Sequence, residues 1–276
     1  MAEVEPYFET RLGRLYCGDA LEVLKQLPDE SADLIILDPP YVKIRDSRTR
    51  GKANWRVTVE HFERVLSESK RIIKRDQPVV LFGLPSFFVK LGRAIDENFR
   101  VYFDVVWEKP APANPLVSQL HPLVVHEQIL FLVRRDAKVS KMKYRPFRIG
   151  SYGNPPVLSG STLGKRFNNM RKVRKAPPDF RYPRTVVRFN HLKKRHGHPT
   201  EKPVELMEWL IRGWTDENDL VVDPFAGSGS ALVGAEKLNR RWVGVEINPD
   251  YCEIIRRRFE RELGDVAKNH RLGQWL

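Results

Sequence analysis

The chain of 276 residues is 41% hydrophobic and 30% charged, the composition of a globular protein that is long enough to bury a substantial core. Its 48 lysine and arginine residues outnumber 35 aspartate and glutamate residues, and the formal charge of +13 favours nucleic acid or another polyanion as partner. Two cysteines are too few for a disulfide framework. The N-terminus is acidic and has no apolar segment, and no apolar run reaches membrane-spanning length. We therefore expect a reducing, cytoplasmic location and no membrane partner.

Strand and helix patterns alternate along the chain, which predicts a mostly parallel sheet covered by helices on both faces. In chain order, short apolar runs predict strands over 14–17, 34–37, 79–83, 101–107, 127–133, 220–223 and 242–247. Stretches with helical spacing predict helices over 20–27, 59–74, 85–97, 204–213, 230–238 and 250–263. The strands over 101–107 and 127–133 are close enough in sequence to be antiparallel neighbours at a sheet edge.

The stretch "LIILDPPYVK" places a carboxylate and two prolines directly after a strand that we expect to be buried on both faces. Asp38 therefore stands at the carboxyl end of a strand, where open α/β sheets bind ligands. Pro39 and Pro40 fix their own φ angles and lack N–H groups, so the peptide forms a rigid shelf with carbonyls free to accept hydrogen bonds. The shelf has no obvious nucleophile, so we expect it to hold and orient a substrate; a simple strand exit is the alternative.

A second stretch, "VVDPFAGSGSALVGAEKLNRRWVGVEI", joins a strand to a helix through a turn that contains glycine. Asp223 ends the strand, and backbone N–H groups of the turn meet at the sheet's carboxyl edge. Glu246 ends the next strand 19 residues after Gly227, the position of an acid that binds ribose hydroxyls in doubly wound nucleotide sites. The turn lacks both the P-loop Gly-Lys-Ser/Thr and the third glycine of the dinucleotide fingerprint, which predicts a nucleoside-like ligand without pyrophosphate, such as S-adenosylmethionine. Strand-end capping is the alternative role of both acids.

The basic charge is concentrated in one segment, residues 134–196, where periodicity fails and 19 lysine and arginine residues stand against only two acids. Aromatic residues are interleaved with this charge, which favours a surface that faces DNA over a merely solvated one. His191, His196 and His198 fit no zinc spacing and have no acid or cysteine beside them, so we expect no metal.

Three motifs in order, "DPPY", "HPTEKP" (His198 to Pro203) and "DPFAGSGS", resemble those of the S-adenosylmethionine-dependent amino-group DNA methyltransferases of the β class, which act on adenine-N6 or cytosine-N4. The resemblance covers the chain apart from 134–196. It implies an α/β Rossmann-like fold with a doubly wound, mostly parallel seven-stranded sheet and an antiparallel edge strand. It further implies a catalytic half over 1–133, an inserted target-recognition region over 134–196 and a cofactor-binding half over 197–276.

Carried over position by position, the resemblance assigns the catalytic role to Asp38, Pro39, Pro40 and Tyr41. It assigns cofactor contacts to Asp19, Thr200, Lys202, Asp223, Pro224, Phe225, Gly227, Ser228, Gly229 and Glu246. Among these, Glu246 would bind the ribose hydroxyls, Asp19 would lie near the adenine, and Thr200 and Lys202 would hold the methionine end. A helix N-cap is the alternative role of Asp19, and the two roles can coexist.

The mechanism follows from the chemistry of an exocyclic amine, which is a poor nucleophile because its lone pair is delocalised into the ring. Asp38 and the Pro39 carbonyl can accept hydrogen bonds from its two N–H groups and present the lone pair to the sulfonium methyl group, so positioning and electrostatics supply the acceleration. Tyr41 would stack on the base, which must leave the duplex. Cytosine-C5 methylation would need a thiolate, usually in a Pro-Cys pair, whereas both cysteines here follow tyrosine.

The expected substrate is double-stranded DNA, with adenine-N6 favoured because relatives with Asp at the first motif position are mostly adenine enzymes. Cytosine-N4 methylation, RNA methylation and a non-catalytic nucleic-acid-binding module on the same fold are the alternatives. Phosphate contacts are expected from Arg171, Lys172, Arg174, Lys175, Lys193, Lys194 and Arg195, and base contacts from Arg181, Arg184 and Arg188. The resemblance to enzymes of restriction-modification leaves open whether a cognate restriction endonuclease is a partner, and whether the chain is a monomer or a homodimer.

Overall fold

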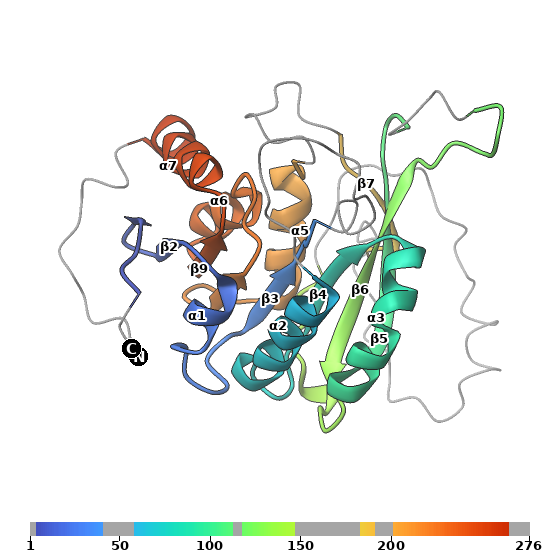
Figure 1. Ribbon diagram of the computed structural model, residues 1–276, viewed down its shortest axis with the longest axis horizontal. Helices are drawn as coiled ribbons and strands as arrows, with labels where there is room; N and C mark the ends of the chain where they lie inside the picture. The colour runs from blue at the N-terminus through green and yellow to red at the C-terminus, as the bar shows by residue number, and fades with distance from the viewer. Residues whose placement is uncertain (1–3, 41–57, 113–117, 147–182, 191–200, 265–276) are drawn as a thin grey trace, which may run out of the picture. The chain divides into compact units, whose positions relative to one another are not determined.

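The computed structural model describes residues 4–40, 58–112, 118–146, 183–190 and 201–264 (Figure 1). The chain divides into two compact units, one formed by residues 1–145 with 185–276 and the other by residues 146–184. Nearly all described residues belong to the first unit, whose architecture is a single sheet between two layers of helices. Within the described ranges, none of the helices combines the length and apolarity that a membrane span requires.

The described residues form one nine-stranded sheet in the order β1-β2-β9-β8-β3-β4-β6-β5-β7. Its strands are β1 (Phe8–Glu9), β2 (Gly13–Cys17), β3 (Leu34–Leu37), β4 (Val79–Gly83), β5 (Phe99–Glu108), β6 (His126–Arg134), β7 (Val186–Arg188), β8 (Leu220–Asp223) and β9 (Arg241–Glu246). Strands β2, β9, β8, β3 and β4 run parallel, and β6 runs antiparallel to both of its neighbours, β4 and β5. The prediction of a doubly wound, mostly parallel α/β sheet is confirmed.

All seven expected strands are present, and the count of nine arises from two short strands at the edges. β1 pairs antiparallel with β2, and β7 pairs parallel with β5. Strands of two and three residues are too short to show the alternation on which strand prediction rests. β7 also lies inside the segment 134–196 that we expected as an insertion, yet it belongs to the main sheet. The second compact unit, 146–184, falls within the same segment.

The helices of the described residues are α1 (Ala20–Leu24), α2 (Val59–Ile72), α3 (Pro85–Asn98), α5 (Val204–Trp214), α6 (Ser230–Lys237) and α7 (Pro249–Leu263), with a 3-10 turn η3 (Val139–Lys141). Helices α1, α2 and α3 lie side by side on one face, and α5 and α6 contact each other and the strands from the opposite face (Figure 1). Thr58 caps α2 by accepting a hydrogen bond from the His61 N–H, and Pro85 opens α3, as its fixed φ favours.

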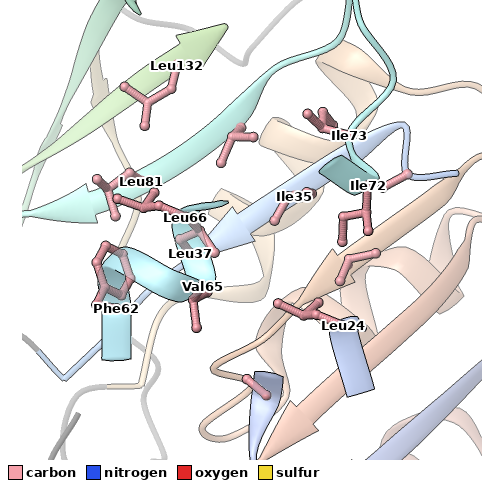
Figure 2. Packing of buried hydrophobic residues seen from close by; sticks show 14 of the residues in the cluster. Leu24, Ile35, Leu37, Phe62, Val65, Leu66, Ile72, Ile73, Leu81 and Leu132 are labelled. Atoms are coloured by element: carbon pink, nitrogen blue, oxygen red, sulfur yellow. The ribbon is translucent and has the colours of Figure 1, made fainter. Parts of the chain in front are cut away.

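The core on the α1–α3 side interlocks side chains of helices and strands (Figure 2). Ile35 and Leu37 of β3 belong to this cluster, together with Phe62 and Leu66 of α2. The alternate positions of β3, Leu34 and Ile36, are also fully buried but lie outside the cluster, because successive strand side chains point to opposite faces. The expectation that β3 is buried on both faces is therefore confirmed.

Candidate active site

The strand order gathers the predicted acids at one place. Asp19, Glu246, Asp223 and Asp38 follow or end β2, β9, β8 and β3, which are consecutive neighbours in the sheet. The register sets Cys17 opposite Glu246, so β2 and β9 end level, and it sets Asp223 opposite Gly244, so β8 ends two residues before β9. We call this edge of the sheet the carboxyl edge; it is where doubly wound folds bind their ligands.

The turn after β8 is shaped by hydrogen bonds and by two glycines. The Phe225 N–H donates to the Asp223 carboxylate over 3.0 Å, and the Gly227 N–H donates to Oε2 of Glu246 over 2.8 Å. Gly227 and Gly229 have φ angles of 55° and 77°, in the left-handed region that favours glycine. The turn is therefore fastened directly to the acid that ends β9.

Glu246 is a buried carboxylate with hydrogen bonds on both oxygens, because Oε1 also accepts from the Asn248 N–H over 2.9 Å. Burial raises the pKa of Glu246, and hydrogen bonds from the backbone N–H groups of Asn248, Gly227 and Ile247 partly oppose that shift. The carboxylate has about four lone pairs in all, so acceptor capacity remains for a hydroxyl of a vicinal diol such as that of a ribose. The sequence assignment of Glu246 to ribose hydroxyls fits this geometry.

Asp223 is 4% exposed, and its environment disfavours a negative charge. Burial raises the pKa of Asp223 to about 8, the charges of Asp38 and Glu246 add to the shift, and the hydrogen bond from Phe225 opposes it. A buried acid of this kind ionises most readily beside a cation. The position therefore suits a ligand that carries positive charge. Pro224 is buried beside it, and the ring of Phe225 lies 5.7 Å from that of Phe62 on α2.

The shelf after β3 is engaged by a lysine from the other half of the chain. Lys202 Nζ donates to Oδ1 and Oδ2 of Asp38 over 2.9 and 2.7 Å, and its side chain is only 4% exposed. Asp38 itself retains 20% exposure of its side chain, so the carboxylate still reaches the surface of the site. Pro39 is buried behind it and Pro40 is half-buried. Burial raises the pKa of Asp38 and the nearby Glu127 adds to this, whereas Lys202 lowers it.

The ion pair at Asp38 continues along the carboxyl edge. Glu127 Oε2 lies 3.4 Å from Lys202 Nζ, and its Oε1 accepts from Lys109, which follows β5. Sequence reasoning missed Glu127, although the period-two pattern of its strand contains the signal: Glu127 shares a face with the buried Ile129 and Phe131. An acid on a buried strand face needs a partner, and here the partner belongs to the site.

Arg258 of α7 is the second residue that sequence reasoning missed. Its side chain is fully buried, forms an ion pair of 2.8 Å with Glu201 and donates to the carbonyl oxygen of Ser228 over 3.0 Å. It thus ties the segment before α5 to the glycine turn. Within the run "RRR" all three residues look solvated, but helical spacing places Arg258 on the face of the buried Ile255 and Phe259.

Asp19 is the N-cap of α1, where its Oδ1 accepts from the Leu21 N–H over 2.8 Å. The capping interpretation is confirmed, while its contact with a cofactor stays a prediction. Asp19 Oδ1 also lies 3.5 Å from His61 Nε2 on α2.

The remaining predicted residues divide into described and undescribed positions. Ser228 is buried and its carbonyl is held by Arg258. Arg188, on β7, donates to Glu108 over 2.6 Å, and Arg184 precedes β7. Outside the described residues lie Tyr41, Thr200, Arg171, Lys172, Arg174, Lys175, Arg181, Lys193, Lys194 and Arg195. Among the described residues no group of histidine, cysteine and acidic side chains could hold a metal ion.

Comparison with known proteins gives concordant matches. A family model described as DNA methylase (N6_N4_Mtase) matches residues 32–257. The type II methyltransferase M.BamHI of Bacillus amyloliquefaciens is 29% identical over 94% of this chain, which spans only 60% of that protein. The DNA adenine methyltransferase YhdJ of Escherichia coli strain K12 is 26% identical, over 93% of this chain and 91% of its own length.

Solved structures share the fold. The PvuII DNA methyltransferase, which is titled cytosine-N4-specific, superposes with a TM-score of 0.67 and 21% identity, covering 96% of this chain and 94% of that one. The M1.HpyAVI complex with SAM gives a TM-score of 0.59 and 23% identity, covering 90% of this chain and 100% of the other.

Proposed function

The chain belongs to the DNA methylase family, and from this premise we propose that it transfers a methyl group from S-adenosylmethionine to an exocyclic amino group of a base in DNA. The observation that carries the proposal is the adjacency of two structures at the carboxyl edge. The Asp38-Pro39-Pro40 shelf directly follows β3. The glycine turn begins at Asp223, the last residue of β8, which is the strand beside β3. Substrate and methyl donor would therefore meet between two consecutive strand ends.

The described residues fit S-adenosylmethionine as the cofactor. Glu246 keeps acceptor capacity for the ribose diol, and the left-handed Gly227 and Gly229 let the backbone approach the ligand closely. Asp223 is a buried acid that ionises readily beside a cation, and S-adenosylmethionine carries positive charge on its sulfonium and amino groups. When bound, this cofactor supplies an electrophilic methyl group.

Asp38 supplies the polar chemistry of the proposed reaction. One of its oxygens and the Pro39 carbonyl accept hydrogen bonds from the two amino N–H groups, so the nitrogen becomes pyramidal and its lone pair leaves conjugation with the ring. The nitrogen would gain a bond to the methyl carbon as the carbon–sulfur bond breaks, with its electron pair left on sulfur, and the nitrogen would then pass one proton to the Asp38 carboxylate. Because burial raises the pKa of Asp38, this carboxylate is a better proton acceptor than an exposed one.

Adenine-N6 is the acceptor that we propose, and cytosine-N4 is the second candidate. The aspartate at the start of "DPPY" and the likeness to the adenine enzyme YhdJ support adenine. The likeness to a structure titled cytosine-N4-specific is the observation that keeps cytosine in consideration. Both reactions use the same shelf, since each methylates an amino group conjugated to a ring.

Double-stranded DNA is the proposed partner, with the segment 134–196 as its target-recognition region. The density of basic residues in that segment supports this assignment. Tritium transfer from labelled S-adenosylmethionine to duplex DNA, with RNA of the same sequence in parallel, tests the substrate class. We expect label in DNA, recovered as N6-methyladenine after hydrolysis to nucleosides. N4-methylcytosine would move the assignment to the second candidate, and label in RNA alone would reject DNA as substrate.

A further inference from the structure

Lys202 occupies a position that the sequence assignment to the methionine end of the cofactor does not explain. Its ammonium contacts both oxygens of Asp38, at 2.9 and 2.7 Å, rather than pointing at the glycine turn. Its backbone carbonyl accepts a hydrogen bond from Ser230 Oγ over 2.7 Å, at the first residue of α6. The residue thus joins the backbone of the cofactor half to the carboxylate of the catalytic half.

The surroundings of Lys202 fix where its charge can lie. Its side chain is 4% exposed, its Nζ lies 5.3 Å from the centre of the Phe82 ring, and Glu127 Oε2 is 3.4 Å away. A buried ammonium is stable only when its charge is balanced, and here two acids and an aromatic face balance it. Lys109 in turn pairs with Glu127, so charges alternate along the carboxyl edge in the order Lys109, Glu127, Lys202 and Asp38.

We propose that Lys202 is a positioning residue that keeps the Asp38 carboxylate charged and aimed at the amino group to be methylated. The inference rests on the proposed function, because it assigns a role within that reaction. A carboxylate without a fixed partner can rotate about its Cβ–Cγ bond and can take up a proton. Two contacts from one buried ammonium restrict the rotation and favour the charged form, and each oxygen keeps a lone pair for an N–H group.

The charges around Asp38 predict in which direction the pH profile of the reaction moves when one of them is removed. Among the described residues, the charged groups that face it are Lys202 before α5, Glu127 on β6, Lys109 after β5 and Asp223 at the end of β8. Lys202 and Lys109 lower the pKa of Asp38, and Glu127 raises it. The acidic limb of kcat/KM, along which activity appears as Asp38 loses its proton, should therefore move to higher pH without Lys202 and to lower pH without the charge of Glu127.

The experiment compares Lys202→Met and Glu127→Gln with the wild-type protein, using methyl transfer to duplex DNA as a function of pH. For Lys202→Met we expect the acidic limb to rise by about one pH unit or more, since an opposite charge at this range shifts a carboxyl by about 1 to 3 units. We expect kcat at neutral pH to fall about 100-fold, the effect of a misplaced reacting group. For Glu127→Gln the limb should move the other way, and Lys202→Arg, which keeps the charge, should leave it near its wild-type position.

Lys143→Met is the matched control. Lys143 pairs with Asp33 over 3.2 Å, and Asp33 is a buried acid that precedes β3, at the opposite end of the strand that Asp38 follows. This variant also removes a lysine charge that faces an acid beside β3, but at the end of the strand away from the carboxyl edge. We expect a lower melting temperature and an unmoved acidic limb. Circular dichroism and thermal denaturation establish that each variant is folded before its kinetics are compared.

Equilibrium titration of S-adenosylmethionine separates positioning of Asp38 from binding of the cofactor. If Lys202 positions Asp38, the Kd of Lys202→Met stays within about threefold of wild type, because less than 1 kcal/mol is lost. If the Kd of Lys202→Met for S-adenosylmethionine rises about tenfold or more while the acidic limb does not move, the proposal is overturned. Lys202 would then bind the methionine end of the cofactor. A wild-type protein that transfers no methyl group to DNA would overturn the proposed function itself, whereas an active wild type and a variant with the same pH profile would overturn only the role of Lys202.

Discussion

Asp223 shows at the scale of one residue how burial at the carboxyl edge disfavours a charged carboxylate. Burial raises its pKa to about 8, so the folded protein holds a proton there that the unfolded chain, with a pKa near 3.9, releases. The contribution of this group to the free energy of unfolding is complete below about pH 4 and is lost as the pH rises toward about 8. The slope between these limits is at most about 1.4 kcal/mol per pH unit.

The first prediction is that Asp223→Asn removes this slope, because the amide cannot titrate. Urea denaturation gives the free energy of unfolding of variant and wild type at about pH 5 and about pH 8, and the change in their difference between the two pH values measures this slope. Glu97→Gln is the control, since the side chain of Glu97 is 57% exposed on α3. A stability difference between wild type and Asp223→Asn that is the same at both pH values would show that Asp223 is already ionised in the fold.

Glu246→Gln is the second prediction at this scale. Both oxygens of Glu246 accept hydrogen bonds from backbone N–H groups. The amide nitrogen of glutamine would point its own N–H at one of these donors, so that hydrogen bond would be lost. Hydrogen bonds to a charged group contribute about 1.5 to 3 kcal/mol, so we expect the affinity for S-adenosylmethionine to fall about 10- to 100-fold. Calorimetric titration measures this, and an unchanged Kd would remove Glu246 from the cofactor site.

Sequence reasoning located the acids of the site and Lys202, but it did not predict that Lys202 would bind Asp38, and it missed Arg258. Asp38, Asp223 and Glu246 stand at strand ends, and a strand end can be read from an apolar run that stops. Lys202 and Arg258 form ion pairs and hydrogen bonds with residues far away in the sequence. A local sequence pattern does not predict which acid a given lysine will bind. Periodicity would have marked Arg258 as buried, since it lies on the face of Ile255, but not that it binds the turn after β8.

At the scale of elements, the turn between β8 and α6 contains two glycines with left-handed backbone angles, Gly227 and Gly229. Gly229 has a φ angle of 77°, and a Cβ there would lie 3.0 Å from the side chain of Ile255 on α7. The third prediction is that Gly229→Ala destabilises the fold by about 1 to 2 kcal/mol, the cost of a left-handed conformation for an L-residue. Thermal denaturation measures the effect.

Gly92 is the matched control for that substitution. It lies within α3, where a Cβ would meet nothing within 4 Å. Gly92→Ala should stabilise the protein by about 0.5 to 1 kcal/mol, because alanine loses less backbone entropy in a helix. Equal effects of the two substitutions would mean that the turn does not require glycine.

Element prediction succeeded where periodicity was long and failed where it was short. The helices α2 and α3 have 14 residues each and were placed within two residues of their ends. β1 and β7 escaped detection because their residues carry no alternation, and their pairing with β2 and β5 depends on the assembled sheet. The predicted insertion over 134–196 was marked by lost periodicity, a signal that cannot distinguish a separate unit from a short strand such as β7.

At the scale of the whole molecule, charge and cofactor motifs lie in different parts of the chain. The unit 146–184 lies within the basic segment, while the glycine turn, Asp38 and Glu246 belong to the first unit. The fourth prediction is that replacing residues 147–183 by a short glycine-serine linker leaves the affinity for S-adenosylmethionine within about threefold and ends sequence-specific methylation of DNA. A shortened chain that still methylates DNA with the wild-type sequence preference would place recognition elsewhere.

The central claim is that the shelf after β3 carries out amino-group methylation beside a separately built cofactor site. The most direct measurement is methyl transfer to duplex DNA by Asp38→Asn and wild type under saturating S-adenosylmethionine, with the methylated nucleoside identified by mass spectrometry. We expect wild type to yield a base methylated on its exocyclic amino nitrogen, and Asp38→Asn to lose activity by about 100-fold or more, since an acceptor is lost at the reacting group. Wild-type turnover by Asp38→Asn, or a methyl group on a ring carbon, would contradict the claim.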